Sequence, residues 1–394
     1  MNKLYQDRNL RIIFGVTLMA VLGVSSITPV FPKIMHELQV TGDQVGLLIT
    51  FFTLPGVIMS PFLGILGDRF GRKKILVPSL FLFAIAGTAC SMARDFNLLL
   101  ALRALQGVGA AGLGALNITI LSDLYSGRQR AEAMGLNASV LSIGIAVYPT
   151  IGGALALLGW YYPFVLPIIA IPIGILVLTS LKSPEPPNSQ NMREYLSGTW
   201  RHLNNIRVGI LFAAGILTFI ILYGAYLTFF SLLLGESFGA SPFIIGLIMS
   251  GMSLTTAGVS SQLGRINKRF SLDNIIKWAF VIYALALVLI PVMPNLWLLL
   301  IPVIIFGIAH GASIPSIQAA IAEMAPLEYR AAFMSINASM LRLGQTIGPP
   351  LMGLVYIYLG LDATFFAAAA LALTMPALAV VAGRRTRSHQ MRDA

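Results

Sequence analysis

Long apolar runs follow one another along most of the chain, and short polar segments separate them. Each run has roughly the 20 residues that an α-helix needs to cross the hydrocarbon layer of a membrane. The first run is too long for a signal peptide and lacks a small-residue cleavage site, so we interpret it as a span. The pattern predicts twelve membrane-spanning helices, at residues 11–31, 44–66, 75–93, 97–122, 132–158, 161–181, 207–234, 242–263, 273–293, 295–323, 330–358 and 361–382.

The two halves of the chain repeat each other. Residues 130–153 and 330–353 share ten of 24 positions, including Asn137/Asn337, Gly144/Gly344 and Pro149/Pro349, and weaker matches at the same offset extend through each half. We therefore predict an all-α membrane protein with twelve transmembrane helices in two pseudo-symmetric six-helix bundles. The bundles are residues 1–181 and 207–394, the second with a short cytoplasmic tail, and 182–206 form a Pro-rich cytoplasmic linker. Parallel repeats of this kind are typical of transporters that open a central site to one side at a time.

Composition and charge agree with this reading and orient the chain. Hydrophobic residues make up 57% of the chain and charged residues 10%, against about 25% charged residues in soluble domains. Of the 26 Lys and Arg residues, 22 fall in the tails and alternate loops, while only Lys33 and Arg94 fall in the opposite loops. Basic loops stay in the cytoplasm, so we expect a multi-pass protein of the bacterial plasma (inner) membrane with both termini cytoplasmic. The net charge of +11 is dispersed over short loops, which argues against nucleic-acid binding.

Several other functional classes find no support in the sequence. The single cysteine, Cys90, cannot form an internal disulfide, and no metal-ligand spacing occurs. The pattern Gly107-x-Gly109-x-x-Gly112 matches a dinucleotide fingerprint, but it lies inside an apolar span instead of after a strand. Small residues at this spacing let membrane helices pack closely. We expect no cofactor, no metal and, because no nucleophile–base pair appears, no enzyme activity.

The loop after the second predicted span carries a family resemblance. Gly64-Ile-Leu-Gly-Asp68-Arg69-Phe-Gly71-Arg72-Lys73-Lys74 resembles the loop signature of the major facilitator superfamily, whose fold has twelve spans in two parallel halves. The resemblance implies a cytoplasmic gate, in which Asp68 lies near the N-terminal end of span 11 and the basic residues pair with acids such as Asp123. We expect Gly64 to allow close helix approach and Gly71 to supply a tight turn. An ordinary basic turn would explain Arg72, Lys73 and Lys74 alone.

Three further stretches resemble the twelve-span drug-efflux branch, whose members exchange drugs for protons. They are Leu22-Gly23 with Pro29-Val30-Phe31-Pro32 in span 1, Leu99 to Ala111 around Arg103 and Gln106 in span 4, and Gly135 to Gly153 in span 5. The branch usually has glycine where Tyr148 stands, which argues against close packing there, whereas span 11 keeps the glycine. The expected helix-bending residues are Pro29, Pro32, Gly144, Pro149, Gly152, Gly153, Gly344, Gly348 and Pro349.

Few charges lie inside the predicted spans. A charge at the middle of the membrane is costly and usually functional, so Arg103 with Gln106 is the strongest candidate for a functional charge. The resemblance links this arginine to proton transfer. The alternative is a structural arginine capped by backbone carbonyls. Arg342 replaces Ser142 of the first half, and either meets an anionic group or serves as a packing hydrogen-bond donor. His310 titrates near neutral pH, unless it is a satisfied core histidine.

The sequence places no acid at the centre of a span, which argues against a pocket for cations and weakens proton coupling. The remaining proton carriers are Asp123, Glu323, Glu37, Asp43 and His310. We expect a monomeric exporter of small neutral or weakly anionic amphiphiles, with membrane lipid around it and protons as the implied coupling ion. An importer of an organic anion or nutrient and a non-transporting membrane sensor are the alternatives. The candidate cavity residues between the halves are Ser25, Ser26, Asn117, Asn137, Tyr148, Tyr223, Tyr226, Asn337, Arg342 and Gln345.

Overall fold

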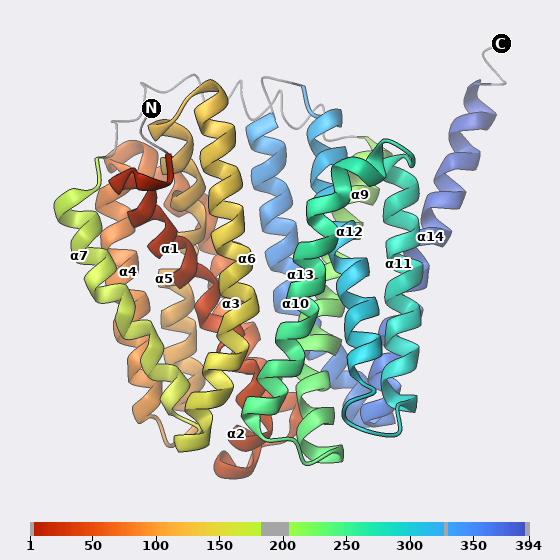
Figure 1. Cartoon of the computed structure of the whole chain (residues 1–394), viewed down its shortest axis with the longest axis horizontal. Helices are drawn as coiled ribbons and strands as arrows, with labels where there is room; N and C mark the ends of the chain where they lie inside the picture. Colours follow the sequence, from red (N-terminus) through yellow and green to blue (C-terminus); the bar gives the residue numbers. More distant parts are fainter. Residues whose placement is uncertain (1–3, 183–204, 327–329, 391–394) are drawn as a thin grey trace. The chain divides into compact units, whose positions relative to one another are not determined.

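The computed structural model describes residues 4–182, 205–326 and 330–390, and these residues form helices and no strands (Figure 1). The structure leaves undescribed most of the predicted linker 182–206 and the side chains at 61, 65, 68, 131, 330–332 and 379–390. The chain divides into two compact units. Unit 1 contains residues 1–188 and 231–250, and unit 2 contains residues 189–230 and 251–394.

Polar side chains cap two of the long helices of unit 1 at their N-terminal ends. The Asp7 carboxylate caps α1 by accepting a hydrogen bond from the Asn9 N–H at 2.7 Å, and Asp95 caps α5 in the same way through Leu98 at 2.8 Å. The first predicted span breaks at Pro29 and Pro32 into three pieces, as expected for prolines in a helix. The elements are α1 (Arg8–Ser25), η2 (Thr28–Val30), α2 (Phe31–Leu38), α3 (Gly42–Phe70), α4 (Arg72–Ala89), η3 (Cys90–Met92), α5 (Phe96–Leu124), α6 (Gly127–Leu158), η4 (Tyr162–Ile169) and α7 (Ala170–Ser180).

Unit 2 repeats this arrangement with one departure in its first span. After α9 (Ile206–Ile220) the chain continues as a ten-residue π-helix, η5 (Ile221–Phe230), and a second π-helix, η6 (Leu233–Ser237), follows within the part assigned to unit 1. Runs of π-helix are rare and often mark functional sites. The later elements are α10 (Pro242–Asn267), α11 (Leu272–Leu289), η7 (Ile290–Val292), α12 (Leu300–Met324), α13 (Arg330–Leu359) and α14 (Leu361–Gln390).

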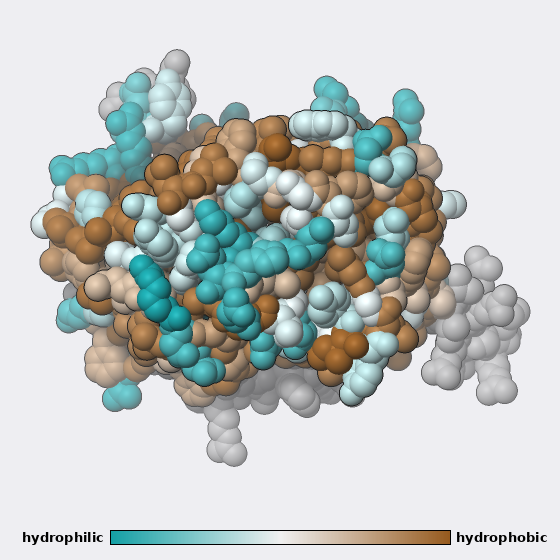
Figure 2. Space-filling model, turned by 90° about the horizontal axis from the view of Figure 1, so that it is seen from below, coloured by the Kyte–Doolittle hydropathy of each residue, from teal (hydrophilic) through white to brown (hydrophobic). Residues whose placement is uncertain are grey.

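The observed helices match the predicted spans closely. Among the described residues, eleven helical segments are long and apolar enough to cross a membrane. The remaining predicted span, the eleventh at 330–358, corresponds to α13, which has the length but carries Arg342 and Gln345 among its apolar residues. Large apolar side chains such as Ile58, Phe62 and Ile85 are more than half exposed, as expected for lipid-facing positions. On the face shown in Figure 2, hydrophobic residues likewise border the hydrophilic ones.

Small residues bring the helices of each unit into close contact. A Cβ at Gly107 of α5 would collide with the backbone carbonyl of Phe52 in α3, and one at Gly109 would lie 2.6 Å from the Phe83 nitrogen in α4. The equivalent Gly307 of α12 faces the Met252 carbonyl oxygen at 2.7 Å from a built Cβ. The Gly107–Gly112 pattern is therefore a helix-packing surface inside α5, as predicted, and lacks the strand that a dinucleotide site requires.

We predict that Gly107→Ala lowers the thermal unfolding midpoint of the detergent-purified protein by several degrees, because the added methyl group must displace the backbone at Phe52. The matched control is Gly135→Ala in α6, where a built Cβ meets no described heavy atom within 4 Å. Alanine is a better helix former than glycine, so this control should unfold at the same temperature or slightly higher. Equal behaviour of both variants would contradict the packing argument.

Candidate functional site

The loop between α3 and α4 forms the turn predicted for the gate motif. Gly71 has a φ of 101°, a conformation that favours glycine, and it separates the end of α3 from the start of α4. A Cβ built on Gly64 meets no described heavy atom within 4 Å, so the expectation that Gly64 permits close helix approach is wrong in this structure. The Asp68 side chain, on which the gate prediction depends most, lies outside the description.

Arg72 joins two helix ends within unit 1. It forms an ion pair with Asp123 and donates a hydrogen bond from Nη1 to the Thr119 carbonyl oxygen at 3.0 Å. Arg72 begins α4 and Asp123 lies in the last turn of α5. Each side chain therefore has the same sign as the partial charge of its own helix end, which is unfavourable, and the ion pair offsets both unfavourable interactions. Nearby, Lys73 donates to the Leu181 carbonyl oxygen at 3.2 Å, while Arg69 is exposed and lies over Phe70.

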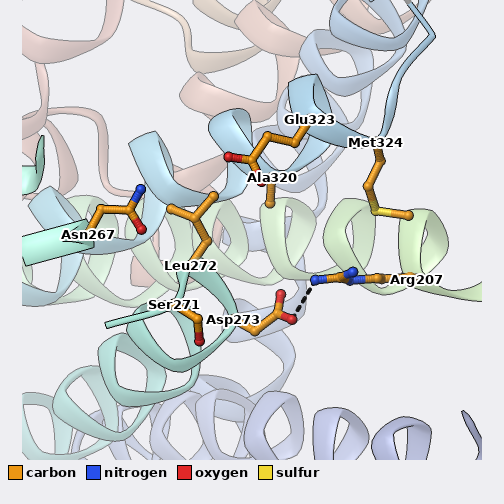
Figure 3. Close-up of a pocket in the computed structure, with 8 residues that line it drawn as sticks. All are labelled: Arg207, Asn267, Ser271, Leu272, Asp273, Ala320, Glu323 and Met324. Atoms are coloured by element: carbon orange, nitrogen blue, oxygen red, sulfur yellow. Dashed lines mark hydrogen bonds and ion pairs between the residues drawn. The ribbon is translucent and has the colours of Figure 1, made fainter. Parts of the chain in front are cut away.

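Unit 2 lacks this ion pair at the equivalent place. Leu272 and Glu323 stand where unit 1 has Arg72 and Asp123, and a pocket of about 440 Å³ opens there (Figure 3). Arg207 and Asp273 form an ion pair of 2.6 Å on its wall, and both side chains are largely exposed. The lining residues are Arg207, Asn267, Ser271, Leu272, Asp273, Ala320, Glu323 and Met324. The two units therefore differ most in charge at this end.

Arg103 is held inside unit 1 by three neighbours. Its Nε donates to the Leu48 carbonyl oxygen at 3.1 Å, its Nη1 donates to Gln106 Oε1 at 2.7 Å, and its guanidinium carbon lies 4.2 Å from the centre of the Phe52 ring. Only 1% of the residue is exposed, and Nη2 has no hydrogen-bond partner among the described residues. The carbonyl cap that the sequence left as an alternative is thus present in part, and both N–H groups of Nη2 stay available among the described residues.

Three polar residues of the first half bond to each other between helices. Asn117 of α5 donates to Thr17 Oγ1 of α1 at 2.6 Å, and Thr17 lies 2.5 Å from the Asn137 amide oxygen of α6. Ser26 bonds to the Leu22 carbonyl of its own helix. Asn117, Asn137 and Ser26 are buried. In this structure they stabilise helix packing, whereas the sequence analysis expects them to line an open cavity. Ser25 and Tyr148 are partly exposed.

Buried polar groups without a hydrogen-bond partner also occur in the second half. Asn337, the repeat partner of Asn137, is 1% exposed, and its amide oxygen has no hydrogen-bond partner among the described residues. Thr218 and Ser316, which belong to the same half, are also fully buried, and their hydroxyls have no hydrogen-bond partner among the described residues. Tyr226 is also fully buried, with its ring stacked on Phe230 and Phe306 at centroid distances of 5.0 and 4.6 Å. The expectation that Tyr226 lines the cavity is therefore wrong in this structure.

A group of partly exposed side chains remains in unit 2. Tyr223 lies on the π-helix η5, with its ring stacked on Phe219 at 5.7 Å, and it lies near enough to Arg342 of α13 to interact electrostatically. Phe219 also meets the His310 ring edge-on at 6.4 Å. We call this set the polar–aromatic group; its members, each partly exposed, are Phe219, Tyr223, His310, Arg342 and Gln345.

His310 belongs to a short hydrogen-bond network that the sequence analysis missed. Its Nδ1 lies 2.6 Å from the Tyr283 hydroxyl, which in turn lies 3.2 Å from the Ser313 hydroxyl. The repeat could have revealed the network, because Tyr283 and His310 stand where the first half has Phe83 and Ala110. Two polar replacements on neighbouring helices are a signal that residue-by-residue inspection overlooks. The Tyr283 contact fixes the orientation of the imidazole beside Phe219.

The expected helix-bending residues lie at close helix contacts within unit 1. A Cβ on Gly152 of α6 would collide with the Ser26 carbonyl, and one on Gly153 with the Pro242 carbonyl. Close packing therefore persists despite Tyr148, contrary to our expectation from that substitution. Helices α6 and α13 continue through Pro149 and Pro349, and Gly144, Gly344 and Gly348 also face neighbouring helices at short range.

Residues 231–250 are joined to η2, α2 and α6 by polar bonds. Ser231 donates to the Thr28 carbonyl oxygen at 2.6 Å, and the Thr150 and Ser250 hydroxyls are 2.9 Å apart. His36 and Glu236 meet at 2.9 Å at a largely exposed position. Together with Gly152 and Gly153, these contacts fasten the helix ends remote from Arg72 in unit 1.

Comparisons with known proteins address the whole chain. The family model described as Major Facilitator Superfamily matches residues 13–233 and again residues 211–393. Multidrug resistance protein 2 of Bacillus subtilis (strain 168) is 27% identical over 344 residues, covering 86% of each chain. Quinolone resistance protein NorA of Staphylococcus aureus (strain MRSA252) is 26% identical over 345 residues, covering 85% of this chain and 86% of NorA.

A solved structure shows the same fold at low sequence identity. It is a bacterial homolog of the human lysosomal transporter Spinster, in an inward-facing and occupied conformation, with a TM-score of 0.81 at 18% identity over 98% of both chains. The predicted fold class is confirmed, with two related halves built from membrane helices.

We predict that Arg103→Lys lowers the thermal unfolding midpoint by several degrees. An ammonium group cannot reproduce the two directed N–H bonds and the ring contact of the guanidinium, and a lost buried hydrogen bond costs about 1–3 kcal/mol. Arg265 offers a matched control, because it bonds to Gln262 over the same 2.7 Å but at an exposed position. Arg265→Lys should leave the midpoint unchanged, and a similar small effect of both replacements would show that the Arg103 contacts contribute little.

Proposed function

Because this chain belongs to the Major Facilitator Superfamily, we propose that it is a secondary active transporter that exports small neutral or weakly anionic amphiphilic compounds. Members of this family are transporters and not enzymes, and the chain is a multi-pass membrane protein. Both relatives described above are named for resistance to drugs, which favours export of drug-like molecules or metabolites. We place the chain in the bacterial plasma membrane, as a monomer with both termini in the cytoplasm.

The observation that carries the substrate class is the polar–aromatic group of unit 2. It offers flat rings, an amide and a guanidinium, and no acidic side chain of the described part of unit 2 lies within the middle of a helix. Asp273 and Asp362 lie in first turns, and Glu323 lies in the last turn of α12. Apolar walls with a few polar groups suit amphiphiles, and without a central carboxylate cations have no strong partner. This supports neutral and weakly anionic substrates over cationic ones.

We infer that transport proceeds by alternating access of residues 1–181 and 207–394, joined by the linker 182–206. In this proposal the gate motif at Gly71–Lys73 helps to close the cytoplasmic side, with Asp68 as the acid that engages the other half. The Arg72–Asp123 ion pair supports the proposal, because it fixes the start of α4 to the end of α5 and thereby holds the loop that carries the motif. The buried Ser231–Thr28 bond and the Thr150–Ser250 bond would hold the opposite side when that side is closed.

Protons are the coupling ion in this proposal, and His310 is the carrier that the contacts favour. An imidazole can take up and release a proton, whereas the guanidinium of arginine does not release its proton in proteins. The Tyr283 hydroxyl at 2.6 Å gives the imidazole a fixed partner, and the contact of His310 with Phe219 within the polar–aromatic group supports a carrier close to the proposed substrate site. Arg103 then has a structural or electrostatic part in unit 1.

The transport proposal is tested in everted membrane vesicles energised with a proton gradient. We expect accumulation of neutral and weakly anionic fluorescent amphiphiles and little accumulation of lipophilic cations. Asp68→Asn should be expressed and inserted normally but should accumulate less than a tenth of the wild-type amount, because it removes the charge of the gate acid. Uptake in right-side-out vesicles, or preference for cations, would contradict the proposed direction or substrate class.

Matched variants separate the gate from general damage. Lys74→Gln, at an exposed position of the same loop, should transport normally. Asp68→Glu keeps the charge and should retain part of the activity. Full activity of Asp68→Asn would remove this acid from the gate.

We predict that His310→Gln abolishes accumulation driven by the proton gradient but leaves exchange of labelled for unlabelled substrate intact. Glutamine keeps a hydrogen-bonding group near Tyr283 but cannot carry a proton at this pH. His36→Gln, at the exposed contact with Glu236, is the control and should accumulate substrate normally. Gradient-driven accumulation by His310→Gln would exclude His310 as the coupling residue.

A further inference from the structure

Arg342 lies inside a predicted membrane span, and none of the acidic residues that the structure describes forms an ion pair with it. It lies twelve residues after the start of α13 at Arg330, which places it about 18 Å along the helix. The side chain is partly exposed, and in the described part of the chain its guanidinium has no ion pair and no hydrogen bond to protein. The first half has Ser142 at this position, so the repeat fold does not require an arginine here.

The acids of unit 2 that the structure describes are all too peripheral to neutralise Arg342. Asp273 pairs with Arg207 at the wall of the pocket in Figure 3, Glu323 lines the same pocket, and Asp362 begins α14. An uncompensated charge away from water is costly. A partner from outside the protein is therefore expected at the guanidinium, and that partner must carry negative charge.

The surroundings of Arg342 select the kind of anion. Tyr223 lies near the guanidinium and supplies a hydroxyl donor. Its ring is stacked on Phe219 at 5.7 Å with an interplanar angle of 21°, and Phe219 is followed by His310 at 6.4 Å. All three rings are partly exposed. A cation and a hydroxyl beside flat rings match a molecule that carries a carboxylate on an aromatic system.

On the basis of the proposed transport function, we propose that Arg342 and Tyr223 bind the carboxylate of the substrate and that the preferred substrates are aromatic carboxylic acids. A guanidinium can hold a carboxylate through two parallel N–H bonds, which gives both strength and orientation. The aromatic part of the substrate packs against Phe219 and Tyr223. The role of Arg342 is thus to distinguish acids from uncharged molecules of the same shape.

A lipid phosphate would offer the guanidinium similar chemistry. The position of Arg342, about 18 Å from the start of α13, is far from the level at which headgroups lie, and the neighbouring rings fit a flat molecule better than an acyl chain. The experiment below distinguishes the two sources by changing the lipid.

The test uses the full-length protein in liposomes of phosphatidylcholine alone and in liposomes that also contain phosphatidylglycerol. The probes are naphthalene-2-carboxylate and naphthalene-2-carboxamide, which share a ring system and differ in charge. Their apparent affinities are measured by inhibition of exchange of a neutral fluorescent substrate. We expect the wild type to bind the carboxylate about ten-fold more tightly than the amide, with the same ratio in both lipids.

Three variants decide the assignment. Arg342→Gln should bind both probes equally, with the amide affinity unchanged, and Arg342→Lys should keep part of the preference for the acid. Arg265→Gln, at an exposed position, should behave as the wild type. An acid preference that survives Arg342→Gln, or a wild type that binds neither probe or both equally, would overturn the inference.

The remaining outcomes are also informative. A preference that appears or disappears with phosphatidylglycerol would assign Arg342 to lipid and overturn the substrate assignment. Continued exchange of the neutral substrate in any of these cases leaves the transport function standing. Loss of all exchange by the wild type would instead reject the transport function itself.

Discussion

A membrane interior offers no water to polar groups, so each polar side chain inside this protein needs a partner from the protein or from a bound molecule. This constraint separates the polar residues of the chain into two sets. Arg103, Asn117 and Asn137 find partners between helices of unit 1. Arg342 and the polar–aromatic group of unit 2 are partly exposed, and Arg342 lacks a described protein partner. The second set is where a transported molecule has most to bind.

The internal repeat gives both halves one backbone plan and different chemistry. Gly107 and Gly307 make the same close approach to the carbonyls of Phe52 and Met252, so the helix packing is shared. Asn137 and Asn337 are shared and buried. Other polar positions differ, because Val303 and Phe306 replace Arg103 and Gln106, while Tyr283 and His310 replace Phe83 and Ala110. The Arg72–Asp123 pair likewise becomes Leu272 and Glu323. In our proposal, the polar side chains that differ in the second half are the ones that bind a substrate.

The fold followed from the sequence because apolar runs of membrane length and a 200-residue repeat leave few alternatives. The structural reasons for single residues were harder to predict. Gly64 meets no neighbour although its motif led us to expect a close helix contact, and Tyr226 is stacked in the core although its hydroxyl resembled a cavity group. The surroundings of Gly64 and Tyr226 depend on which side of a helix faces a neighbouring helix. In η5 the π-helical turn changes which residues lie on that side, compared with an ordinary α-helix. His310 was found by its charge, whereas its partner Tyr283 required comparison of the two halves.

The most direct test of this account is a cryo-electron microscopy map of the protein with a transported amphiphile bound. The account predicts density for the compound against Phe219, Tyr223, His310 and Arg342 of unit 2. Density only against other helices, with these four side chains free of ligand, would contradict the assignment of the substrate site.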